Sequence, residues 1–487
     1  MALLTPNYIT MARLTSLVKD TAIYGMSSIV GRFLNYLLVP LYTNVISAAS
    51  GGYGMVTNLY AYTALILVIL TFGMETTFFR FANKEDEDTD TVFSTTMAMV
   101  SVLALAFLAA VFAFIDPLAA TLHYTAHPEF LEMMAVVVAL DAIQAIPFCM
   151  LRYQKRPLQF AALKLLFIVL NIGLNCVYFL VLGHDDVFGV FMLNLVCTSI
   201  IMVLFLPQLL RIRWKVDLAL LRRMFSYSWP ILVLGIAGIL NQTADKMLFP
   251  LVCPDTAEAN VQLGIYGACV KIAMIMAMIT QAFRYAYEPF VFAQSKEKDK
   301  NETYAMAMKY FIIFTLLAFL CVMAYIGVLQ YIIGKDYREG LRVVPIVMAA
   351  EIMMGVYFNL SFWYKLIDRT IWGAWFSLAG CTVLVAVNLI FIPQYGYMAC
   401  AWGGFAGYGT AMVLSYIVGQ RKNPIHYPMR SILTYTLLAI IGYACIELSN
   451  RNLPLWAALA VNTVVVIAFT AYLVSRDMRP ILRRFKR

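Results

Sequence analysis

The chain has 487 residues, of which 62% are hydrophobic and only 13% are charged, and its formal net charge is +9. Soluble proteins are about 45–50% apolar and about 25% charged, so this composition excludes both a soluble enzyme and a disordered chain. It indicates an all-α polytopic membrane protein whose helices each need about 20 apolar residues to cross the bilayer.

Apolar runs separated by charged or turn residues predict about 14 membrane-spanning helices. The N-terminus shows no cleavable signal peptide, so the first run is interpreted as an uncleaved helix. In chain order, the predicted spans are 21–46, 54–79, 92–115, 130–151, 160–183, 187–210, 226–250, 264–292, 304–333, 340–364, 371–392, 397–419, 430–449 and 453–475.

Two short matches indicate an internal repeat. Gly54 follows a tyrosine at the start of one apolar run, as Gly267 does later, and Glu75 and Glu288 are separated by the same offset. Repeat-built transporters place their substrate site between the halves, near the midplane of the membrane. We therefore predict an N-lobe over 1–210, a basic interfacial linker over 211–225, a C-lobe over 226–420, and two further helices with a basic tail over 421–487.

Lysine and arginine are concentrated in alternate loops and in the C-terminal tail, whereas the opposite loops hold almost none. The positive-inside rule then places both termini in the cytoplasm. The same asymmetry explains the basic composition without nucleic acid, which is not expected as a partner.

Five segments, in the same order along the chain, resemble the Wzx-type polysaccharide and oligosaccharide-lipid flippases. They are GRFLNYLLVPLYTNVISAASGGYG (31–54), LLRRMFSYSWP (220–230), GIYGACVKIAMIMAMITQAFRYAYEPFVF (264–292), IIGKDYREGLRVVP (332–345) and NLIFIPQYGYMACA (388–401). The resemblance implies two six-helix lobes around a V-shaped central cavity. It also implies flipping of undecaprenyl-pyrophosphate-linked sugars across the bacterial inner membrane for surface polysaccharide synthesis, in contact with membrane lipids and with polysaccharide polymerase machinery.

Charged residues inside predicted spans are the candidates for substrate binding, because each costs about 2.5–3.5 kcal/mol at a helix centre. Cations suit a pyrophosphate, and arginine suits it best because its planar fork donates two hydrogen bonds at once. The candidate cations are Arg32, Lys164, Lys271 and Arg284. Lys271 and Arg284 lie roughly 20 Å apart along one helix, so they cannot both contact one pyrophosphate.

Three of these four cations have a simpler structural interpretation. Arg32 can form an ion pair within its lobe, Lys164 can extend to the headgroups, and Arg284 can pair with Glu288. Polar residues that share a helix face with Arg32, Lys164 or Asp245 predict cavity lining: Tyr24, Ser28, Asn35, Asn171, Asn175 and Asn241.

Three carboxylates, Glu75, Asp245 and Glu288, are candidates for binding H⁺ or Na⁺ as a coupling ion, or for ion pairs. If Glu75 and Asp245 form ion pairs instead of binding a coupling ion, their expected partners are Lys246 and Arg32. No phosphate-binding loop or metal motif is present, and no cofactor or metal is expected. Gly403 and Gly407 form a G-x-x-x-G pair that close helix packing explains.

Two other functions remain open within the same superfamily, an ion-coupled multidrug antiporter and a lipid II flippase. An antiporter for cationic drugs would favour carboxylates over cations in its cavity. An enzyme is not expected, because no polar stretch much exceeds ~15 residues and a folded domain needs about 50.

Overall fold

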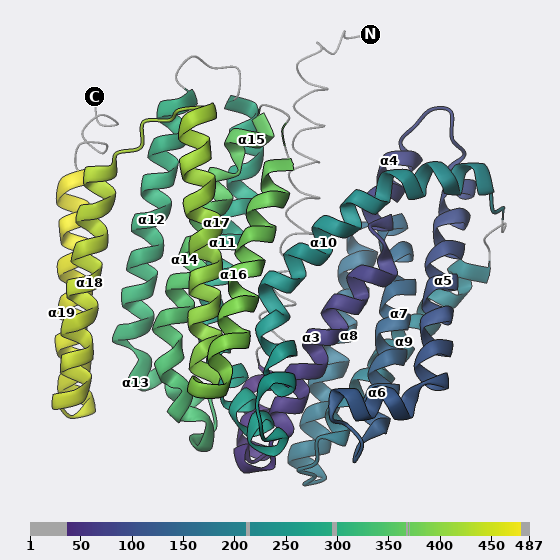
Figure 1. Cartoon of the computed structure of the whole chain (residues 1–487), viewed down its shortest axis with the longest axis horizontal. Coiled ribbons are helices and arrows are strands. Elements are labelled where there is room, and N and C mark those ends of the chain that lie inside the picture. Colours follow the sequence, from purple (N-terminus) through teal and green to yellow (C-terminus); the bar gives the residue numbers. More distant parts are fainter. Residues whose placement is uncertain (1–36, 211–214, 295–299, 367–368, 370, 479–487) are drawn as a thin grey trace, which may run out of the picture. The chain divides into compact units, whose positions relative to one another are not determined.

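A computed structural model describes residues 37–210, 215–294, 300–366, 369 and 371–478, and these residues contain helices but no strand (Figure 1). The chain forms two compact units, Met1–Gly264 and Ile265–Arg487. The described α-helices of the first unit are α2 (Leu38–Val45), α3 (Gly52–Thr71), α4 (Met74–Ala82), α5 (Thr89–Ala113), α6 (Ile115–Leu122), α7 (Pro128–Tyr153), α8 (Pro157–Cys176), α9 (Phe188–Leu210) and α10 (Leu218–Val252).

The second unit begins within α11 (Thr256–Gln294). It continues with α12 (Lys300–Ala324), α13 (Ile326–Leu329), α14 (Val344–Leu360), α15 (Phe362–Leu366), α16 (Ile371–Tyr395), α17 (Tyr397–Lys422), α18 (Met429–Asn452) and α19 (Leu455–Leu473). Figure 1 shows α18 and α19 side by side at the C-terminal end of this unit.

Twelve of the described helical stretches are long and apolar enough to cross a membrane. The predicted span 21–46 is outside this set, and most of it lies outside the described residues. The predicted span 397–419 does form a helix, α17, but its several glycines and polar residues lower its hydropathy. The all-helical membrane fold is therefore confirmed, while the count of about 14 helices stays a prediction.

Polar groups define where several helices begin. The Asp88 carboxylate accepts hydrogen bonds from the Thr91 amide (3.1 Å) and hydroxyl (2.7 Å) at the start of α5. Asp217 accepts from the amides of Ala219 and Leu220, so residues 218–225 of the predicted linker are the first turns of the continuous helix α10. Such caps satisfy amides that have no partner within the helix.

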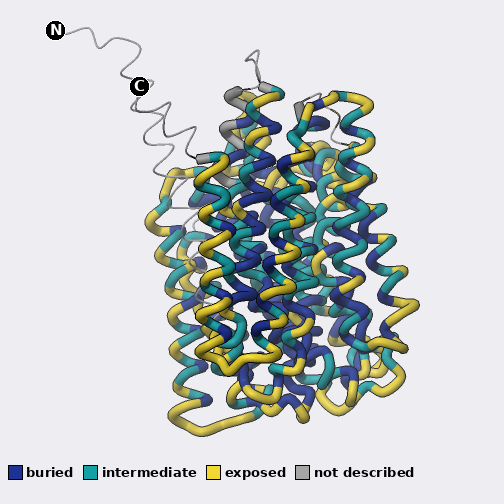
Figure 2. The backbone as a smooth tube through the Cα atoms, turned by 90° about the vertical axis from the view of Figure 1, so that its left-hand side faces the viewer, coloured by how far each residue is buried: buried dark blue, intermediate teal, exposed yellow. Residues whose placement is uncertain are grey.

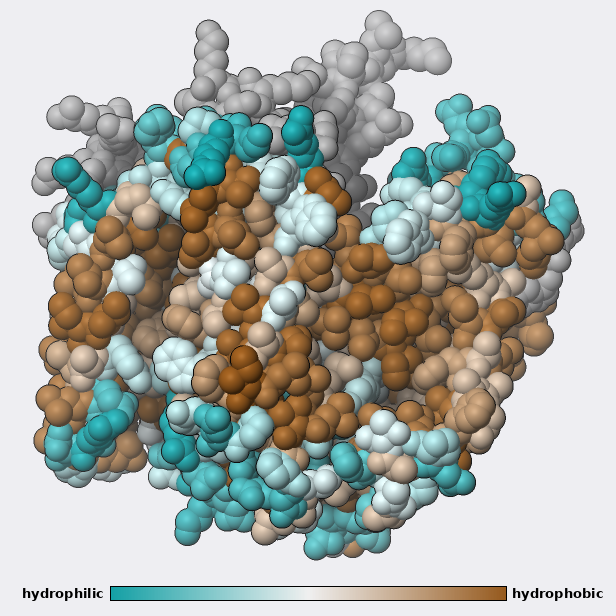
Figure 3. Space-filling model, viewed as in Figure 1, coloured by the Kyte–Doolittle hydropathy of each residue, from teal (hydrophilic) through white to brown (hydrophobic). Residues whose placement is uncertain are grey.

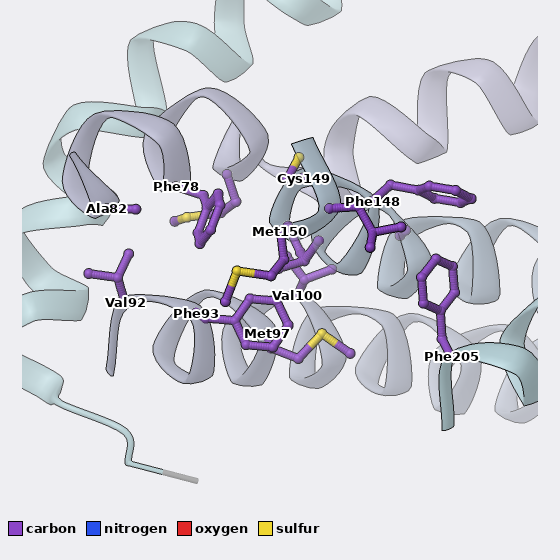
Figure 4. Packing of buried hydrophobic residues seen from close by; sticks show 14 of the residues in the cluster. Phe78, Ala82, Val92, Phe93, Met97, Val100, Phe148, Cys149, Met150 and Phe205 are labelled. Atoms are coloured by element: carbon purple, nitrogen blue, oxygen red, sulfur yellow. The ribbon is translucent and has the colours of Figure 1, made fainter. Parts of the chain in front are cut away.

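The core of the first unit is formed where α4, α5, α7 and α9 meet. Phe78, Phe93, Phe148 and Phe205 are buried there, and Phe148 contacts Phe205 edge-on with 4.8 Å between ring centroids (Figure 4). Buried and exposed positions alternate along the helices (Figure 2), as expected for helices that pack on one face.

In the second unit, α16 and α17 approach closely at glycines. A side chain added at Gly407 would lie 2.8 Å from the Gly380 carbonyl, and one added at Gly403 would lie 2.5 Å from Asn388 Oδ1. Close packing therefore accounts for the G-x-x-x-G pair, as the sequence indicated.

Candidate substrate site

Four charged side chains on α4, α7 and α8 of the first unit interact with one another. They are Glu75, Asp141, Arg152 and Lys164. At one end, Arg152 in the last turn of α7 pairs with Glu75 in the first turn of α4 at 3.2 Å. Arg152 also donates to Cys149 Sγ at 3.1 Å. Glu75 is thus in an ion pair, but its partner is an arginine that lies just beyond the predicted span 130–151 and was not among the candidate partners.

Lys164 projects from α8 beside this pair. Lys164 is exposed as a residue, but its Nζ lies 4.0 Å from the centroid of the buried Phe148 ring on α7. Asp141 and Glu75 both interact electrostatically with Lys164. An ammonium within a membrane-spanning helix is suited to an aqueous cavity or to lipid headgroups, the two alternatives that the sequence left open.

The asparagines of α8 lie deeper in the same unit. Asn175 is fully buried, accepts a hydrogen bond from the Tyr42 hydroxyl (2.9 Å), and donates to Asn171 Oδ1 (2.8 Å). These bonds join α2 to α8, and the assignment of Asn171 and Asn175 to a cavity lining stays a prediction.

The polar face of α10 carries a second ion pair. Lys246 Nζ lies 3.0 Å from the carboxylate of its neighbour Asp245, which is buried. Asn241, one turn earlier, donates to the Ala237 carbonyl at 2.9 Å and is also buried. The structure therefore pairs Asp245 with Lys246, one of the two cations considered for it.

In the second unit, Lys271 and Arg284 lie on α11. The Arg284 guanidinium lies 4.9 Å from the centroid of the Phe358 ring on α14. A small cavity beside it is also lined by Lys365, Thr280 and Asn359, which brings a second cation close to Arg284. Glu288 lies on the same helix, and its side chain is outside the described residues.

A larger cavity of about 550 Å³ lies between α12, α14, α17 and α18, and its walls are almost wholly apolar. Its lining includes Met308, Phe319, Met353, Phe405 and Tyr443. Figure 3 shows apolar side chains over the middle of the helices and hydrophilic ones near their ends. A cavity of this size and polarity suits a hydrocarbon chain better than a charged group.

The first-helix candidates Arg32, Tyr24, Ser28 and Asn35 lie outside the described residues. Among the residues the structure does describe, no three His, Cys, Asp or Glu side chains gather as metal ligands would.

A family profile described as "Polysaccharide biosynthesis protein" matches residues 17–287, more than half of the chain. The chain belongs to this family. The fold of this family member is similar to that of a lipid II flippase, MurJ, in an inward closed conformation, with a TM-score of 0.74 and 14% identity over 93% of this chain and 99% of that one. It is also similar to an inward-facing multidrug resistance transporter of the MATE family in the MOP superfamily, with a TM-score of 0.60 and 14% identity over 85% and 95% of the two chains. No curated protein sequence matches it.

Sequence reasoning missed an ion pair in the second unit of this family member, between a buried lysine and a mostly buried aspartate. Lys309 on α12 and Asp477, after α19, form an ion pair, and the Tyr435 hydroxyl of α18 also donates to Asp477. Lys309 lies within a predicted span, so the same search for intramembrane charges would have found it. No sequence signal identifies its partner, because the two residues are far apart in the chain.

Proposed function

We propose that this protein translocates undecaprenyl-pyrophosphate-linked oligosaccharide units across the bacterial inner membrane by alternating access between two lobes, for O-antigen, capsule or exopolysaccharide synthesis. The observation that carries the proposal is the apolar cavity of about 550 Å³ between α12, α14, α17 and α18. A substrate with a long hydrocarbon chain can use such a cavity, whereas a free sugar cannot. Membership of the polysaccharide biosynthesis family supports the sugar part of the substrate.

The pyrophosphate is assigned to cations on the helices. Lys164 in the first unit is exposed, and Arg284 in the second lies beside Lys365 at a small cavity. Guanidinium and ammonium groups bind phosphate oxygens through short, charge-assisted hydrogen bonds. Arg32 and Lys271 complete the proposed set, with the polar residues Tyr24, Ser28, Asn35, Asn171, Asn175 and Asn241 lining the path.

The proposed lobes are 1–210 and 226–420, with both termini in the cytoplasm, and no enzymatic step is required. We assign the energy that returns the empty protein to its starting conformation to the membrane potential or to a gradient of H⁺ or Na⁺. Moving one charge through 100 mV involves about 2.3 kcal/mol. Glu75, Asp245 and Glu288 are the proposed coupling carboxylates, the first two of which are ion-paired in this structure.

Flipping in sealed proteoliposomes tests the proposal. We expect the protein to expose a labelled undecaprenyl-pyrophosphate oligosaccharide to an impermeant reagent. Lys164→Ala and Arg284→Ala should each lower the rate by about tenfold or more, since a charge-assisted hydrogen bond contributes about 1.5–3 kcal/mol. Arg451→Ala is the matched control, because Arg451 is 74% exposed at the end of α18 and its ion pair is with Glu447, one turn earlier in the same helix.

Parallel assays separate the alternatives. Faster flipping of lipid II than of the oligosaccharide lipid would favour a lipid II flippase. Ion-driven efflux of cationic dyes without lipid flipping would contradict the proposal and favour a multidrug antiporter.

A further inference from the structure

The 3₁₀-helix η4 (Lys335–Val343) of the second unit separates its side chains by face, because residues three apart share a face of such a helix. One face is buried and consists of Tyr337, Gly340 and Val343. A methyl group added at Gly340 would lie 2.6 Å from Ile265 Cγ2, and the Cys269 thiol donates to the Tyr337 carbonyl at 3.2 Å. These contacts hold η4 against α11.

Lys335 and Arg338 share a second face of η4. Arg338 is fixed in orientation, because its Nε donates to the carbonyls of Gln330 (3.1 Å) and Ile333 (3.2 Å). Its guanidinium carbon lies 4.7 Å from the centroid of the exposed Tyr331 ring. Lys335 is exposed. Among the described residues, neither the Lys335 ammonium nor the terminal nitrogens of Arg338 have a hydrogen-bond or ion-pair partner.

The carboxylates of η4 lie on its third face. Asp336 and Glu339 are three residues apart there, together with Arg342, whose Nε donates to the Tyr397 hydroxyl at 3.1 Å. Within the described part of the chain, neither carboxylate forms an ion pair with the two cations of the second face. The second face therefore presents two positive charges that no direct contact among these residues neutralises.

The position of η4 is the end of a membrane span. It continues directly into α14 as one stretch that is long and apolar enough to cross a membrane. The preceding helix α13 lies at the end of the unit where α18 and α19 connect (Figure 1), and a methyl group added at Gly327 would lie 2.9 Å from Leu455. Three aromatic side chains are exposed at this end, Tyr331, Tyr395 and Trp456. Because exposed tyrosine and tryptophan gather at the level of lipid headgroups, the two cations lie at that level too.

We propose that Lys335 and Arg338, with Tyr331 beneath the guanidinium, bind the phosphate group of an anionic phospholipid such as phosphatidylglycerol. The terminal nitrogens of Arg338 donate to the phosphate oxygens while Nε keeps the group oriented, and Lys335 adds a second charge-assisted hydrogen bond. The acyl chains lie along the exposed apolar side chains of Val328 and Ile332, which precede the cations in the chain. A phospholipid matches both the charged and the apolar part of this surface, whereas a soluble anion matches only the charged part.

Native mass spectrometry of the full-length protein, titrated with phosphatidylglycerol in detergent, measures this binding. We expect Arg338→Ala to weaken lipid affinity about tenfold and Lys335→Ala about threefold, because each removes a charged donor. Arg338→Lys keeps the charge but loses the planar fork, and should stay at least about threefold weaker than the wild type. Lys335→Ala also protects the test against misfolding, because the Lys335 side chain has no partner among the described residues.

Two controls separate a specific site from general attraction between charges. Arg451→Ala removes one positive charge at the same end of the unit, where Arg451 is exposed and pairs with Glu447, and it should leave lipid affinity unchanged. Phosphatidylcholine, whose own ammonium opposes the two cations, should bind the wild type about tenfold more weakly than phosphatidylglycerol does.

Three results would overturn the inference. They are wild-type affinity in the double variant Lys335→Ala with Arg338→Ala, equal weakening by Arg451→Ala, and displacement of the lipid by inorganic phosphate, which would identify a site for soluble anions instead. Lipid binding is measured without translocation, so these results do not depend on the proposed function.

Discussion

Lys309→Met is expected to lower the free energy of unfolding by about 3–5 kcal/mol, because it leaves the Asp477 carboxylate buried without its cation. The Lys309 and Asp477 side chains are only 8% and 11% exposed. Tyr435, which is fully buried, donates to the same carboxylate, but a neutral hydroxyl cannot replace the lost charge. Thermal unfolding of the purified protein in detergent should show a melting temperature lowered by several degrees.

Two variants test the cause of this loss. Arg451→Met removes an exposed ion pair, 2.8 Å from Glu447, and should change the unfolding free energy by less than about 1 kcal/mol. The double variant Lys309→Met with Asp477→Asn should recover much of the stability, because no buried charge remains unpaired. Equal losses in the single and double variants would contradict a charge-based explanation.

The close contact of α3 with the first turns of α11 leads to the second large effect. Gly54→Ala is expected to destabilise the protein by about 3 kcal/mol, at the upper end of the usual cost of overpacking. The added methyl group would lie 1.8 Å from the Asn260 carbonyl oxygen, which is backbone and cannot rotate away. Thermal unfolding, monitored by helical circular dichroism, measures the loss.

Gly238→Ala is the matched control. Gly238 lies within α10 of the same unit, and an added methyl group there would have no neighbour within 4 Å. Alanine at an open helical position should leave stability unchanged or raise it by up to about 1 kcal/mol. If both variants unfold at the wild-type temperature, the approach of α3 to α11 is looser than this structure indicates.

For the charged residues, the sequence predicted which ones lie within membrane spans, but not always which residues they pair with. The cost of a charge within the membrane indicated that Glu75 needs a role or a partner, but helical period did not identify Arg152 as that partner. The Asp245–Lys246 pair was easier, because the two residues are adjacent in the chain. The first-helix candidates, with Arg32 foremost, stay predictions.

The sequence by itself determined the all-helical membrane class, the approximate bounds of the described spans and the resemblance to polysaccharide flippases, because a span requires a long apolar run that is visible residue by residue. Only the tertiary structure decided that Lys309 meets Asp477 and that four helices of the second unit line an apolar cavity. Helical period determines which side chains share a face. It does not determine which distant helix covers that face, since packing of side-chain shapes across the whole unit decides that.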